Sequence, residues 1–177
     1  FFRLNGISYE ALPIETNDEG KENLFAGRCD VYTTDASGLS STRAAASNPD
    51  KWVVLPEIIS KEPLGPLVRH GDHQWGDVVR WSLNAMIIAE ELGITSENVD
   101  AQMSSNVPEV LRLLGAEGNY GEMLELSNDW AYQIIKQIGN YSESYEANVG
   151  PDTPLEIARG LNALWTQGGI LYAPPFR

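Results

Sequence analysis

The first 57 residues alternate between short apolar runs and short helical patterns, and this alternation constrains the fold more than any other feature. We predict strands at 7–15, 28–35 and 51–57, and helices at 16–27 and 36–48. Thr16 and Glu19 have the spacing of a capping box, and Gly27 is placed to end the first helix. The order strand, helix, strand, helix, strand with short loops predicts an α/β layer fold.

A segment that contains two prolines, residues 57–66, separates this region from the rest of the chain. Because Pro63 and Pro66 disfavour a central strand, we interpret the segment as a connection that crosses between two lobes. The predicted layout is an α/β piece at 1–56, a crossing at 57–66 and a mostly helical part at 67–177.

The part after the crossing has the apolar spacing of helices. A long helix is expected to end at Gly93, a short one lies near 107–114, and two helices flank Gly139. We predict a last helix over 153–169, followed by an extended tail.

Composition excludes several classes of partner. The chain of 177 residues has a net charge of −13, with −3 on residues 1–54 and −10 on the remainder. Such a charge argues against binding to nucleic acid or to an anionic membrane surface. No run is apolar and long enough to cross a membrane. The opening "FFRLNG" carries neither Met nor a targeting pattern, as expected for a start inside something larger or for a processed product.

The single cysteine, Cys29, cannot form an internal disulfide. It is either a small apolar residue on a strand or the partner of a cysteine on another segment. His70 and His73 form an H-x-x-H pattern in a turn with no further ligand nearby, so we interpret them as exposed loop histidines and predict no metal site and no cofactor.

Asp35 is the candidate binding residue. It follows the expected strand "RCDVYTTD", and a helix begins immediately after it. In α/β folds, ligands gather at the carboxyl ends of strands. Asp35 is therefore either the N-cap of the helix or an acceptor for a cationic ligand group, and its two carboxylate oxygens allow both roles.

Long blocks of the sequence resemble a known family. The blocks "GRCDVYTTDASGL", "VVLPEIISKEPLGPLVRHGD", "VVRWSLNAMIIAEELGITSENVD" and "IARGLNALWTQGGILYAPPFR" are similar to the periplasmic general L-amino-acid-binding proteins of bacterial ABC importers. These are type II solute-binding proteins, and the resemblance covers only their C-terminal half. It implies a partial periplasmic-binding-protein type II fold and a chain that binds L-amino acids and delivers them to a permease in the inner membrane.

The resemblance also assigns parts of the chain. It implies that residues 1–56 belong to lobe 2, 57–66 to the hinge crossing and 67–177 to the C-terminal part of lobe 1, with a tail that packs on the outside. The hinge residues would be Glu57, Lys61, Pro63 and Pro66. In related proteins the Asp that matches Asp35 accepts the ligand's α-ammonium; Thr34 lies beside it, and Asp30 is the earlier acid of the same pattern.

The groups that hold the ligand's α-carboxylate in this family lie upstream of Phe1. We therefore expect this chain alone to bind amino acids weakly or not at all. The resemblance offers Cys29 as a disulfide partner for an upstream cysteine in the oxidising periplasm.

Two alternatives remain open. One is a dehydratase-like enzyme on the same scaffold, for which only Asp35, Asp30 and Glu57 offer acid–base groups. The other is a truncated half that assembles only with a missing N-terminal fragment or with a second copy.

Overall fold

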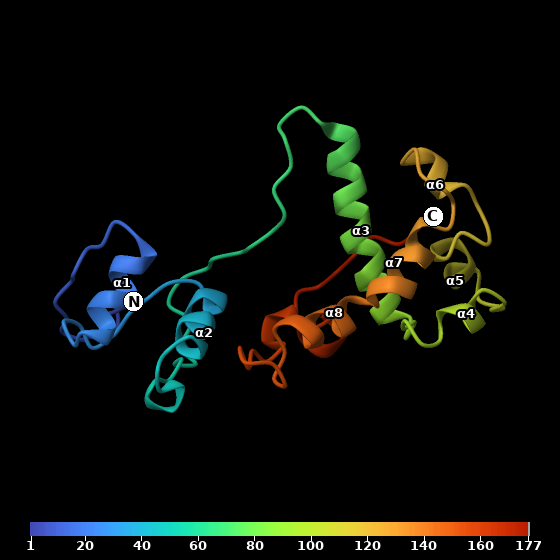
Figure 1. Cartoon of the computed structure of the whole chain (residues 1–177). Helices are drawn as coiled ribbons and strands as arrows, with labels where there is room; N and C mark the ends of the chain where they lie inside the picture. Colours follow the sequence, from blue (N-terminus) through green and yellow to red (C-terminus); the bar gives the residue numbers. More distant parts are fainter. Residues whose placement is uncertain (177) are drawn as a thin grey trace. The chain divides into compact units, whose positions relative to one another are not determined.

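The computed structural model describes residues 1–176, which divide into two compact units, Phe1–Leu64 and a second unit that begins at Gly65. The first unit contains the helices α1 (Asn17–Phe25) and α2 (Ala36–Ala44) and the 3-10 turn η1 (Pro49–Lys51) (Figure 1). The helices of the second unit are α3 (His73–Glu91), α4 (Val99–Gln102), α5 (Pro108–Leu113), α6 (Tyr120–Met123), α7 (Trp130–Ile138) and α8 (Tyr141–Asn148), followed by the 3-10 turns η2 (Gly160–Asn162) and η3 (Trp165–Gln167).

Helix α1 begins and ends where its local signals place it. The Thr16 side chain accepts a hydrogen bond from the Glu19 amide, and Gly27 follows the helix with a φ of +68°. The Glu19 carboxylate reaches back to the amide of Glu15, one residue before the position that a standard capping box uses. Gly20 lets the helix lie close to Tyr32, because a Cβ there would stand 2.5 Å from the ring.

The three predicted strands are wrong as paired elements. Residues 7–15, 28–35 and 52–57 lack helical structure and Lys51 belongs to η1, but no sheet forms within residues 1–176, where the one isolated bridge joins Leu164 and Leu171. An apolar pattern specifies an extended backbone, whereas a strand also needs a neighbour to bond its amides and carbonyls. Val53 and Leu55 remain 76% and 59% exposed, so these segments keep an uncovered apolar face.

The second unit packs around the long helix α3. Helices α5, α7 and α8 contact α3, and α4 contacts α7 (Figure 1). The largest side chains that this packing excludes fully from water are Ile94, Leu113, Leu114, Ile135 and Val99. The expected helix ends are confirmed at Gly93 and Gly139, both of which have positive φ.

The predicted helix over 153–169 is wrong. That segment holds only η2 and η3, because Glu156 and Gly160 adopt positive φ and interrupt any α-helical run. Gly169 approaches the Ala163 carbonyl so closely that a Cβ would stand 1.8 Å from its oxygen. The segment therefore folds back on itself as a turn-rich loop.

The C-terminal tail is extended, yet it does not stay on the outside as expected. Phe176 is 6% exposed and contacts the rings of Trp81, Tyr120 and Trp130. The Arg112 side chain donates to the Phe176 carbonyl at 3.1 Å. The tail thus contributes an aromatic side chain to the core of the second unit.

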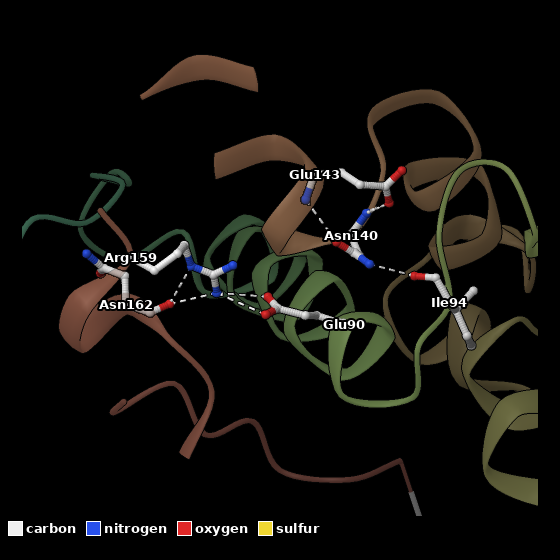
Figure 2. Close-up of polar contacts among 6 residues, drawn as sticks. All are labelled: Glu90, Ile94, Asn140, Glu143, Arg159 and Asn162. Carbon is white, nitrogen blue, oxygen red and sulfur yellow. Dashed lines mark hydrogen bonds and ion pairs between the residues drawn. The ribbon is translucent and has the colours of Figure 1, made fainter. Parts of the chain in front are cut away.

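Two polar clusters fix α8 and the loop after it (Figure 2). The Asn140 side chain caps α8 through the Glu143 amide and donates to the Ile94 carbonyl at 2.8 Å. One nitrogen of Arg159 lies 3.0 Å from both carboxylate oxygens of Glu90 and 2.8 Å from the Asn162 carbonyl. Both clusters tie segments that follow α7 to the end of α3.

Candidate functional site

Asp35 lies between an extended segment and the first turn of α2. Its Oδ1 accepts hydrogen bonds from the Gly38 amide at 2.8 Å and from the Ser37 hydroxyl at 2.5 Å. The N-cap role predicted for Asp35 is therefore confirmed.

The second oxygen of Asp35 is much less engaged. It accepts a long hydrogen bond of 3.4 Å from the Thr34 hydroxyl. The hydrogen bonds from Ser37 and then from the Gly38 amide hold the pKa of the Asp35 carboxyl below its usual range, so the group is anionic at neutral pH. Asp35 can thus cap α2 with one oxygen and offer the other to a cationic ligand group.

Gly38 leaves room beside that oxygen. A Cβ at this position would stand 2.9 Å from Asp35 Oδ2 and 3.1 Å from the methyl group of Thr34. A side chain here would therefore crowd the carboxylate edge that a ligand would approach.

The predicted hinge residues lie on one irregular segment. Glu57, Lys61, Pro63 and Pro66 are all exposed and belong to no helix. The boundary between the two units falls within this segment, after Leu64.

Four other residues were singled out in the sequence. Cys29 is a free, half-buried thiol, and Asp30 is exposed. His70 precedes α3 and His73 is its first residue; both are exposed. Across residues 1–176 no three His, Cys, Asp or Glu side chains come together as metal ligands would.

None of the helices in the described part of the chain has the length and apolarity to span a membrane. No family model matches the sequence.

A solved structure gives the class of protein. The chain matches an ABC transporter periplasmic binding protein from Brucella ovis, with glutathione bound, at a TM-score of 0.90 and 50% identity. The match covers 99% of this chain and 56% of that one. The fold of the chain is thus that of part of a periplasmic binding protein.

Three curated relatives match the chain along its whole length. The chain is 54% identical to the glutamate/glutamine/aspartate/asparagine-binding protein BztA of Rhodobacter capsulatus, across 100% of this chain and 53% of the relative. It is 52% identical to the putative amino-acid ABC transporter-binding protein YhdW of Escherichia coli and 54% identical to the general L-amino acid-binding periplasmic protein AapJ of Rhizobium johnstonii. Over its whole length the chain is homologous to amino-acid-binding proteins of ABC transporters, which confirms the resemblance noted in the sequence. It spans about half the length of these relatives.

Sequence reasoning missed a different feature, on the second unit. Trp165 and Tyr172 line a pocket together with Glu91 and Glu109. Glu91 is at the end of a long helix, and Trp165 lies 74 positions further along the chain. No local sequence pattern therefore predicts their contact.

Proposed function

We propose that the chain is part of the substrate-binding component of an amino-acid ABC importer, acting in the periplasm and delivering its ligand to a membrane permease. The observation that carries this proposal is identity of 52–54% along the entire chain to three such binding proteins. The names of these relatives describe binding proteins, and we assign no catalytic step to the chain.

Asp35 supplies the proposed ligand contact. Its less engaged oxygen accepts the α-ammonium of the ligand, with Thr34 beside it. Free amino acids carry this group, and so does the γ-glutamyl end of glutathione, the ligand bound to the Brucella ovis protein. The α-carboxylate of the ligand is then held by segments outside this chain.

The hinge and lobe assignments extend the same proposal. Residues 1–56 form part of lobe 2, residues 67–177 part of lobe 1, and the exposed segment with Glu57, Lys61, Pro63 and Pro66 bends when the lobes close on a ligand. The thiol of Cys29 forms a disulfide with a cysteine of the remaining polypeptide.

The remaining polypeptide also supplies strands. The extended segments 29–34 and 53–57 offer backbone groups without partners in the described residues, and exposed apolar side chains, as sheet edges do. We propose that strands from the half of the binding protein not matched here pair with these edges and cover Val53 and Leu55.

A chimera tests the function. In BztA, the matching 178 residues are replaced by this chain, and binding of glutamate, glutamine and glutathione is measured by calorimetry beside the chain alone. We expect the chimera to bind at least one of these ligands and the chain alone to bind none of them appreciably. Micromolar binding by the isolated chain would contradict the incomplete site, and a folded chimera that binds none of them would contradict the proposed function.

A further inference from the structure

A pocket of about 210 Å³ opens on the second unit, between the end of α3, the start of α5 and the C-terminal tail. Ile88, Leu92 and Ala173 give it an apolar lining. The aromatic rings of Trp165 and Tyr172 line it as well and meet edge to face, with centroids 5.7 Å apart. The pocket therefore combines an apolar lining with two aromatic faces.

The charge that the described residues bring to the pocket is of one sign. Glu91 and Glu109 line it, whereas no lysine or arginine among residues 1–176 does. The indole N–H of Trp165 donates to Oε1 of Glu91 at 3.1 Å, which holds this carboxylate beside the ring and leaves its other oxygen available. No described lysine or arginine forms an ion pair with either glutamate.

The rim is exposed but anchored. Trp165, Ile170 and Tyr172 are 51%, 70% and 67% exposed, while their neighbours Leu164 and Ala173 are buried. The Trp165 amide donates to the Leu171 carbonyl at 3.0 Å, and Leu164 bridges Leu171. Large aromatic side chains held in place by buried neighbours are typical of the central residues of protein interfaces.

We propose that this pocket binds an arginine side chain of a partner protein. A guanidinium stacks on aromatic faces and pairs with carboxylates, so it complements both the rings of Trp165 and Tyr172 and the charge of Glu91 and Glu109. The exposed apolar rim at Ile170 then packs against the residues that flank the arginine, which favours a protein over a free small cation. All residues of this surface belong to the second unit, whereas Asp35 belongs to the first.

The test uses the full chain and the peptide acetyl-Leu-Arg-Leu-amide, whose blocked amine removes the group proposed to bind Asp35. Binding is followed through the indole N–H signal of Trp165 in nitrogen-15 NMR spectra. We expect the peptide to shift this signal saturably, and we expect the affinity to fall as salt is added. The citrulline peptide, which has nearly the same shape without charge, should bind about tenfold more weakly.

Glu91→Gln should also weaken binding of the arginine peptide severalfold. Trp165→Ala should abolish binding, and because this variant lacks the reporter indole, its binding and that of the native chain are compared by calorimetry. The matched controls are Glu117→Gln and Trp75→Ala, which change an exposed acid and an exposed aromatic residue outside the pocket and should leave binding unchanged. Because Glu91→Gln keeps the size of the side chain, it is informative even if Trp165→Ala fails to fold.

Three results would overturn the proposal. The first is that the arginine peptide does not shift the Trp165 signal. The second is that the citrulline peptide binds as tightly as the arginine peptide. The third is that acetyl-arginine amide binds as tightly as the flanked peptide, which would indicate a site for small cations.

Discussion

At the scale of single residues, Asp35 caps α2 and has a proposed second role in binding the ligand, and two substitutions separate these roles. Asp35→Asn keeps an acceptor for the Gly38 amide but removes the negative charge, whereas Asp35→Ala removes both. We expect Asp35→Ala to lower the free energy of unfolding by about 1 kcal/mol and Asp35→Asn to lower it less. In the chimera with BztA, both variants should weaken ligand binding about 10-fold to 100-fold, measured by calorimetry. Full binding by Asp35→Asn would contradict the ammonium contact.

The lowered pKa of Asp35 predicts a pH dependence with a definite sign. A carboxyl whose pKa is lower in the folded state than in the unfolded state stabilises the fold above its unfolded pKa, about 3.9. This stabilisation is lost as the pH falls through the folded-state pKa. The difference in urea midpoint between the native chain and Asp35→Asn should therefore be largest near neutral pH and vanish in acid. A difference that grows in acid would contradict the assignment.

Gly38 offers a test that leaves the carboxylate in place. Gly38→Ala puts a methyl group 2.9 Å from Asp35 Oδ2, the oxygen proposed for the ligand. Helix propensity favours alanine by about 1 kcal/mol, which offsets part of the crowding, so the chain should remain folded. We expect the chimera with Gly38→Ala to lose ligand affinity while its melting temperature changes little. Ser41→Ala, on an exposed position of the same helix, is the control.

At the scale of elements, the ion pair of Glu90 and Arg159 joins α3 to the loop after α8. The side chains are only 9% and 17% exposed, and the guanidinium also lies over the rings of Tyr141 and Tyr145. Arg159→Ala leaves Glu90 without its partner and should cost about 3–5 kcal/mol in urea unfolding. Arg80→Ala, which breaks an exposed pair with Asp77, should cost less than about 1 kcal/mol. Equal losses of unfolding free energy in the two variants would show that the buried pair stabilises the fold no more than the exposed pair does.

At the scale of the whole molecule, the extended segments of the first unit lack sheet partners. We expect the amides of 29–34 and 53–59 to exchange hydrogen rapidly in the chain alone, while those in the middle of α3 exchange slowly. In the chimera with BztA the same segments should become protected, because strands from the rest of the protein then pair with them. Mass spectrometry of proteolytic fragments measures both states. Rapid exchange in a folded chimera would contradict the proposed pairing.

What the sequence determined by itself is local. Thr16, Asp35, Gly93 and Gly139 mark helix ends through interactions within a few residues, so their positions and the capping by Asp35 were predictable. The sequence also indicated the family, because long blocks of it are shared with the relatives.

What only the tertiary structure decided depends on contacts between distant residues. The extended segments of the first unit remain unpaired because a strand needs a neighbour that no local pattern supplies. The helix expected over 153–169 is replaced by a loop that Arg159 ties to Glu90, across 69 positions. Phe176 and the pocket beside Trp165 likewise depend on the tail folding back onto α3 and α5, and side-chain packing of this kind leaves no periodic signal in the sequence.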